Sequence, residues 1–287
     1  MTIISPQEIE KALKYKNILD RLYEHLDESL GYFDYYQIVG IFLQGSQNYG
    51  LDTEESDVDT KLIVLPKFED IVFNKQPVST THIRENDEHI DFKDLRLYIQ
   101  TFRKQNINFL EILFTDFKIL SNEYEKFWNV LIENREAIAR YNPYQAVNAM
   151  KGHALEKYQK MEHPYPTKKD VLEKFGYDPK QLHHLLRIEE YLGRYIDGEK
   201  YEDCLRPHCP EYLISVKQGR YNLNEARVIA DTAINNIIRV SDVYTDKIEN
   251  IGNPEVDEIF NEVQYDIMKH AMSIELKEDK YYWLNIF

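Results

Sequence analysis

The sequence predicts an α+β protein in which a small mixed sheet with helices precedes an all-helical part of similar size. Two observations carry this prediction. Short runs rich in β-branched and aromatic residues lie between residues 37 and 92, whereas apolar residues recur at helical spacing through most of the remaining chain. Glycine and proline are also scarce, with ten of each among 287 residues, and this favours helices.

The first half is expected to contain one long helix followed by three strands. Apolar residues at helical spacing predict a helix over residues 6–30. Strands are expected over residues 37–43, 60–65 and 89–92, where β-branched and aromatic residues are concentrated. Pro66 ends the second strand because it cannot continue the hydrogen-bonded ladder.

Helical spacing dominates from residue 93 onward. Helices are expected over residues 95–102, 107–114, 123–140 and 223–248, and a last one begins at Pro254. Asn222 is expected to cap the fourth of these, with Glu225 at its third position, and its apolar stripe is expected to face the helical core rather than another subunit. The Asn142-Pro143 pair interrupts the pattern, so we predict two domains, residues 1–140 and 141–287.

Charge and composition argue against several classes of protein. The chain has 35 Lys and Arg against 50 Asp and Glu, and a net charge of −15 argues against a protein that coats nucleic acid by bulk electrostatics. No run approaches the roughly 18 consecutive apolar residues of a membrane helix, and residues 1–16 lack the features of a signal peptide. We therefore expect a cytoplasmic protein without a membrane partner.

The stretch from Gly45 to Asp59 carries the strongest chemical signal. Gly45 has no side chain, so a phosphate can approach the backbone, and Ser46 adds a hydroxyl and an N–H that can bind phosphate oxygens. Asp57 and Asp59 stand two apart at a strand start, so both carboxylates point to one side and Val58 points to the core. Two carboxylates on one edge suit Mg²⁺.

A second metal ion needs a third carboxylate, and Asp91 is the candidate. Asp91 stands between Ile90 and Phe92 on the third expected strand, so it can project onto the same face as the other two acids. With two ions about 3.5–4 Å apart, one activates the attacking hydroxyl and the other stabilises the leaving group. Other acids stand close by in the sequence, and the choice of Asp91 over them stays open.

These residues together resemble the DNA polymerase beta-like nucleotidyltransferase superfamily. The runs Gly-Ser-Gln-Asn-Tyr-Gly at residues 45–50 and Ser-Asp-Val-Asp-Thr-Lys at 56–61 are most similar to a bacterial and phage branch of predicted nucleotidyltransferases. The resemblance continues through residues 108–114 and 177–187. It implies a minimal nucleotidyltransferase palm followed by an all-helical domain, and an enzyme.

The same resemblance implies roles for the motif residues. Gly45 and Ser46 would bind the triphosphate, and Asp57, Asp59 and Asp91 would hold two Mg²⁺ ions, for which Mn²⁺ can substitute. The implied reaction moves a nucleoside monophosphate from an NTP to a hydroxyl and releases pyrophosphate. An RNA end, such as a tRNA 3′ end, is the favoured acceptor, and a protein or small-molecule hydroxyl stays open, as do the preferred NTP and the oligomeric state.

One segment of the second half is basic within this acidic chain. Residues 151–187 hold eight Lys and Arg against five Asp and Glu, a balance of +3. On a helix that starts near Pro179, Lys180 and Arg187 share a face, and we expect both to contact phosphates of the nucleotide or the acceptor. The alternative is a solvated face that forms salt bridges with Glu190 or Glu156.

The sequence argues against two rival functions. A non-catalytic nucleotide-binding regulator would keep the same fold, but it has no need of three carboxylates. A ribonuclease of the helical type needs an Arg and a His on one helix, and the only suitable spacing, Arg84 to His89, runs into an expected strand. Asn108, Glu111 and His153 are expected to be structural, and Tyr49 to stack on a base or ribose.

Overall fold

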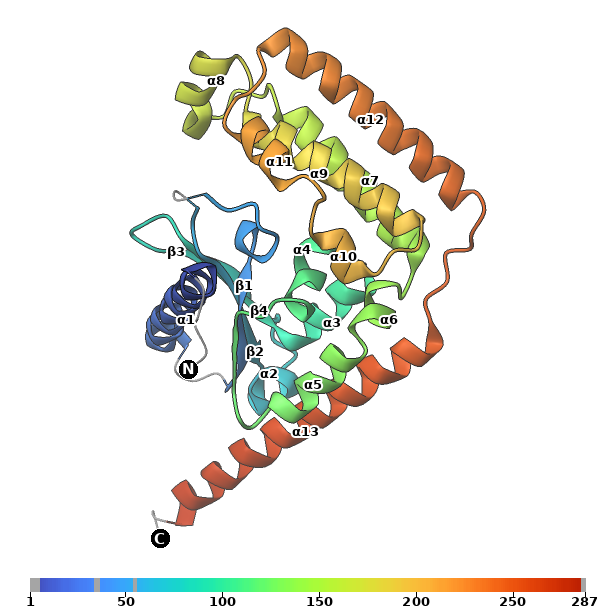
Figure 1. Ribbon diagram of the computed structural model, residues 1–287. Coiled ribbons are helices and arrows are strands. Elements are labelled where there is room, and N and C mark those ends of the chain that lie inside the picture. Colours follow the sequence, from blue (N-terminus) through green and yellow to red (C-terminus); the bar gives the residue numbers. More distant parts are fainter. Residues whose placement is uncertain (1–5, 34–36, 54–55, 285–287) are drawn as a thin grey trace, which may run out of the picture.

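The computed structural model describes residues 6–33, 37–53 and 56–284 (Figure 1). Within these residues five strands form one sheet in the order β3-β4-β2-β1-β5. The strands are β1 (Gln37–Gln44), β2 (Asp59–Leu65), β3 (Ser79–Ile83), β4 (His89–Asp94) and β5 (Lys118–Leu120). Strand β2 pairs antiparallel with β1 and parallel with β4, so the sheet is mixed. The predicted α+β class is confirmed.

Helices make up most of the rest of the described chain. The first half contains α1 (Pro6–Phe33), η1 (Ser46–Asn48), α2 (Phe68–Val72), α3 (Leu95–Arg103), α4 (Ile107–Leu110), η2 (Glu111–Leu113), α5 (Glu125–Glu133) and α6 (Arg135–Ala139). The second contains α7 (Pro143–Lys160), η3 (Pro166–Lys168), α8 (Lys169–Phe175), α9 (Pro179–Ile196), α10 (Tyr201–Leu205), α11 (Pro210–Lys217), α12 (Leu223–Thr245) and α13 (Pro254–Leu284).

The sequence predicted most of these elements and missed some. The three expected strands are present, but β3 and β5 were not predicted, because β3 is exposed and polar and β5 is very short. The prediction of a single helix over residues 123–140 was wrong. The chain leaves helical geometry at Asn134, whose φ is −101° and ψ is 12°, and the helix divides into α5 and α6.

Local capping explains where the helices of the second half begin. The Asn142 side chain accepts from the N–H of Gln145 and so starts α7, with Pro143 in its first turn. The predicted capping box of α12 is confirmed, because Asn222 and Glu225 exchange side-chain hydrogen bonds with each other's backbone. These caps satisfy N–H groups that the helices themselves leave unpaired.

The sheet is covered on both faces. Helix α1 lies on one face (Figure 1), where Ile18 and Leu22 pack against Leu43 and Val58. Helices α3, α4 and α5 lie on the other face and share a core with side chains of β1 and β2. Because β2 alternates, its odd-numbered side chains from Asp59 onward point toward α3 and α4, and its even-numbered ones point toward α1.

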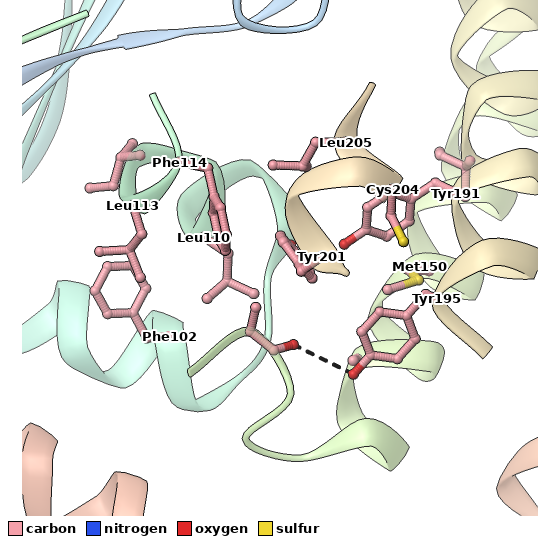
Figure 2. Packing of buried hydrophobic residues seen from close by; sticks show 14 of the residues in the cluster. Phe102, Leu110, Leu113, Phe114, Met150, Tyr191, Tyr195, Tyr201, Cys204 and Leu205 are labelled. Carbon is pink, nitrogen blue, oxygen red and sulfur yellow. Dashed lines mark hydrogen bonds between the residues drawn. The ribbon is translucent and has the colours of Figure 1, made fainter. Parts of the chain in front are cut away.

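One hydrophobic core continues from the first half into the second. Figure 2 shows side chains of η2, α7, α9 and α10 meeting there, with Phe114 stacked on Tyr201 at 4.9 Å between ring centroids. The Tyr195 hydroxyl donates to the Ala139 carbonyl at 3.4 Å, which joins α9 to the end of α6. The small side chains of α12, including Ala226 and Ala230, are buried against α7 and α9, as the predicted stripe requires.

Helix α13 crosses the predicted domain boundary. It runs back beneath α5 (Figure 1) and packs against α3 and α5. Phe260 is fully buried and stacks on Phe102 at 6.1 Å, and Arg103 donates to Asp257 at 2.8 Å. The last helix of the second predicted domain is therefore bound to the first.

The predicted domains and the predicted motif include residues that the structure does not describe. Residues 1–5 and 285–287 of the predicted domains, and Glu54 and Glu55 of the motif, lie outside the described residues. Among the helices that are described, none has both the length and the apolar stretch needed to cross a membrane.

The packing of α13 gives a stability prediction. Phe260→Ala should lower the free energy of unfolding by about 3–5 kcal/mol, because it empties a buried ring site against Phe102. Tyr265→Ala on the same helix should change it by less than about 0.5 kcal/mol, because Tyr265 is 64% exposed. Urea unfolding measures both, and equal effects would contradict the docking of α13.

Candidate functional site

A pocket of about 370 Å³ lies between the end of the sheet where β1 ends and β2 begins and the helices α7 and α9. From the first half it is lined by Gln44, by the motif residues Gly45, Ser46, Tyr49, Leu51, Thr53, Ser56, Asp57 and Asp59, and by Ile107, Asn108 and Glu111. From the second half it is lined by His153, Lys157, Lys180, His183, His184, Arg187, Tyr191 and Lys217. The fold thus brings together six of the seven predicted site residues.

The Gly45-Ser46 turn lies beside the acidic pair because of strand register. Gln44 at the end of β1 pairs with Asp59 at the start of β2, so the turn that leaves β1 adjoins the segment that enters β2. Gly45 has φ of 96°, a conformation that favours glycine, and Ser46 then opens the short helix η1. The Ser46 hydroxyl has no hydrogen-bond partner among the described residues and lines the pocket.

Asp57 and Asp59 line the pocket together, as the alternation predicts. Val58 between them is buried under α1, whereas Asp57 is exposed and Asp59 is partly buried. The Asp59 Oδ1 accepts from the backbone N–H of His89 at 2.9 Å, which fixes that carboxylate against β4. Gln47 donates to the Asp57 carbonyl at 3.3 Å, so the motif turn also supports this segment.

Asp91 is not brought into the pocket lining. It pairs with Lys61 across the parallel strands, so it lies on the same face of the sheet as Asp59, one strand further along. Its Oδ2 accepts from Lys61 Nζ at 3.2 Å, and its Oδ1 accepts from the Thr81 hydroxyl at 3.2 Å. The assignment of Asp91 as a metal ligand therefore stays a prediction.

The chemistry of the donor set fits a hard divalent cation at Asp57 and Asp59. Both side chains offer carboxylate oxygens at the edge of an open pocket, where waters and phosphate oxygens can complete the coordination of Mg²⁺. Within the described residues no three His, Cys, Asp or Glu side chains converge as a complete metal site. A cation at Asp57 and Asp59 would therefore need further ligands, such as waters or phosphate oxygens, beside these two carboxylates.

Helix α9 supplies the two basic side chains that the sequence predicted for the site, Lys180 and Arg187. Together with Lys157 and Lys217 they form one side of the pocket, here called the basic wall. Asp178 caps this helix by accepting from the N–H of Lys180, and both Lys180 and Arg187 line the pocket. Lys180 is exposed and has no ion pair within the described part of the chain. The Arg187 guanidinium lies over the Tyr49 ring at 3.7 Å, so Tyr49 is covered by Arg187 in this structure.

The alternative salt bridges of α9 are not seen among the described residues. Glu156 pairs with Lys157 and Lys160 instead, at the surface of α7. Glu190 pairs with Arg194 on its own helix at 3.5 Å.

Three histidines beside this wall were not assigned to the site by sequence reasoning. Burial lowers the pKa of His153 to about 4, and burial also lowers that of His183 to about 4. The pKa of His184 falls well below its usual value for the same reason. All three are neutral at pH 7, so the positive charge of the wall comes from its Lys and Arg side chains.

Glu111 also belongs to the pocket, although the sequence suggested a structural role. Its side chain is only 4% exposed, and burial raises its pKa to about 8 against the opposing influence of Arg187. Its carboxyl group accepts a hydrogen bond from the Gly45 backbone. A signal was present in the sequence, because Glu111 is a single acid among the apolar residues of the 108–114 run.

Comparison of the sequence with models of known protein families and with curated proteins found no match in either case.

Glu111 gives a pH prediction. Between about pH 4.5 and pH 8 the folded chain keeps the Glu111 proton and the unfolded chain loses it, so stability should fall as the pH rises through this window. The fall attributable to Glu111 is up to about 1.4 kcal/mol per pH unit. Glu111→Gln should remove it, because the amide does not titrate.

Urea unfolding at pH 5.5 and 7.5 measures this difference. Glu258→Gln, at an exposed position of α13, is the matched control and should retain the slope of the unaltered chain. If the stability of Glu111→Gln depends on pH in the same way as that of the control, Glu111 does not carry a raised pKa.

Proposed function

We propose that this chain is a nucleotidyltransferase that moves a nucleoside monophosphate from an NTP to a hydroxyl group. The observation that carries the proposal is the division of one pocket into two walls. Asp57 and Asp59 stand beside the Gly45-Ser46 turn on one wall, and Lys and Arg side chains stand on the other. A nucleoside triphosphate with its divalent cation needs both kinds of surface.

Each wall has a separate task in this proposal. The Ser46 hydroxyl binds the β and γ phosphates, and Lys180 and Arg187 neutralise their charge from the side of α9. Asp57 and Asp59 hold Mg²⁺, which when bound draws charge from the phosphate oxygens. Asp91 stays the candidate for a second ion. Catalysis then rests on position and charge stabilisation.

The reaction joins the acceptor oxygen to the α-phosphorus and breaks the bond to the β-phosphate. Pyrophosphate leaves along the basic wall, and the hydroxyl proton passes to a carboxylate of the pocket. An RNA end is the favoured acceptor, because Lys157, Lys180 and Lys217 form a local basic surface in an otherwise acidic chain. A protein or small-molecule hydroxyl would need the same two walls.

A second candidate function is a nucleotide-binding regulator without catalysis. The position of Asp91 favours it, since Asp91 bonds to Lys61 and Thr81 and does not line the pocket that holds Asp57 and Asp59. The two functions share nucleotide binding and differ in pyrophosphate release. An assay of pyrophosphate with Mg²⁺ and each NTP, in the presence of total RNA, separates them.

Removal of the acidic pair should abolish transfer. In Asp57→Asn and Asp59→Asn, labelling of the acceptor from a radiolabelled NTP should fall more than about 100-fold, because the cation loses its protein ligands. Asp87→Asn is the matched control, since Asp87 is exposed in a turn with φ of 65°, which Asn tolerates. Circular dichroism checks folding, and a folded double variant that retains transfer would refute the site.

The basic wall should determine nucleotide affinity. Lys180→Glu should raise the KM for NTP about tenfold, the factor that about 1.4 kcal/mol of lost phosphate interaction produces. Lys247→Glu, an exposed residue beyond the far end of α12, has the same charge change and should leave the KM unaltered. Steady-state kinetics measures both, and equal KM values would remove Lys180 from the nucleotide site.

A further inference from the structure

Behind the acidic pair, on the opposite face of the sheet, lies a buried group of polar side chains that the proposed reaction does not use. Glu88, immediately before β4, is buried, and His25 of α1 has no exposed surface. Burial of a carboxylate and an imidazole is costly unless each finds partners, so their contacts indicate what they hold in place.

Each of the two side chains contacts a residue that flanks Asp59. Glu88 Oε1 accepts from the backbone N–H of Val58 at 3.3 Å, and its Oε2 lies 2.9 Å from His25 Nε2. His25 Nδ1 lies 2.9 Å from the Thr60 hydroxyl. An ionised carboxylate only accepts, so His25 Nε2 carries a proton. Burial lowers the pKa of His25, so its imidazole is neutral at pH 7 and Nδ1 accepts from the Thr60 hydroxyl.

Two arginine side chains pair with the Glu88 carboxylate. Arg84 donates to Glu88 at 3.0 Å, and Arg21 also donates to the same oxygen. Hydrogen bonds from His25 and Arg21, among others, lower the pKa of Glu88 to about 2 in spite of its burial. Glu88 is therefore a carboxylate at neutral pH and can hold Val58 and His25 at the same time.

The segment that needs this support is the one that carries the acidic pair. Strand β2 begins only at Asp59, so Asp57 and Val58 precede the hydrogen-bonded ladder of the sheet. Side chains alternate here, so Asp57 and Asp59 point into the pocket while Val58 and Thr60 point back toward α1. His89, the residue after Glu88, donates its backbone N–H to the Asp59 carboxylate and so holds Asp59 directly.

We infer that Glu88 and His25 are positioning residues, which fix the two pocket carboxylates from behind by holding Val58 and Thr60. The inference rests on the proposed function, since it assigns the two residues to the cation and transfer chemistry of Asp57 and Asp59. Groups that orient metal ligands without touching the metal typically affect affinity or activity about 10–100-fold when they are removed.

Two variants test the inference by separate routes. Glu88→Gln keeps the shape of the side chain but removes the charge that pairs with His25 and Arg84. Thr60→Val removes only the hydroxyl that donates to His25 and keeps a β-branched residue in the strand, so it serves if Glu88→Gln fails to fold.

The matched control is Glu28→Gln. Glu28 belongs to the same charged surface, because it accepts from Arg84 at 2.7 Å and from His82 at 2.7 Å. Among the residues that the structure describes, Glu28 forms no hydrogen bond to the strand that carries the acidic pair. A loss of α1 attachment alone would therefore appear in the control as well.

Three measurements are made on each protein: Mn²⁺ affinity by electron paramagnetic resonance, hydrogen exchange over residues 56–60 without metal, and transfer kinetics. In Glu88→Gln and Thr60→Val we expect Mn²⁺ affinity and kcat to fall more than about tenfold, with faster exchange and little change in the KM for NTP. Glu28→Gln should match the unaltered chain in all three measurements, even if its Tm is lower.

The possible failures are distinguishable. If the unaltered chain binds Mn²⁺ and transfers nucleotides, and both variants match Glu28→Gln, only the positioning role is overturned. If the unaltered chain neither binds Mn²⁺ nor releases pyrophosphate from any NTP, the proposed function is refuted and the positioning role with it.

Discussion

The antiparallel pairing of β1 with β2 is the constraint on which the candidate site depends. It places Gln44 opposite Asp59, and so it brings the Gly45-Ser46 turn beside the acidic pair. A shift of one residue would turn Asp59 toward α1 and Thr60 toward the pocket, because strand side chains alternate. Buried residues on both strands, such as Ile41 and Leu62, resist that shift, since it would move them out of their core cluster to the opposite face of the sheet.

The basic wall of the pocket depends on helices of the second half that pack against one another. Helix α9 is capped by Asp178 and is surrounded by α7, α11 and α12, so Lys180 and Arg187 are held on a fixed surface. Its histidines are neutral because they are buried among cations. Among the described residues Lys180 forms no ion pair with Asp57 or Asp59, so these charges of the two walls stay available to a charged ligand.

The sequence indicated the parts of the site that depend on local patterns. The Gly-Ser turn, the alternation that directs Asp57 and Asp59 together, and the helix from Pro179 with Lys180 and Arg187 on one face all follow from spacing within a few residues. The alternation also put Asp91 on the correct face of its strand, but its partner Lys61 comes from sheet register, which no local pattern reveals.

The contacts that sequence reasoning missed join distant segments. His25 meets Glu88 across 63 positions of the chain. Glu111 gains its raised pKa from burial at the pocket, where residues of both halves such as Gly45 and Arg187 surround it. Likewise β3 and β5 are short or polar, and their pairing partners rather than their own composition make them strands.

The return of α13 to the first half has a consequence for synthesis on the ribosome. Phe102 is translated 158 residues before Phe260, the ring that stacks on it. Until then the nascent first half presents an uncovered aromatic surface, which is a target for chaperones and for premature association. The core around Phe102 is therefore completed only when α13 has been made and has packed against α3 and α5.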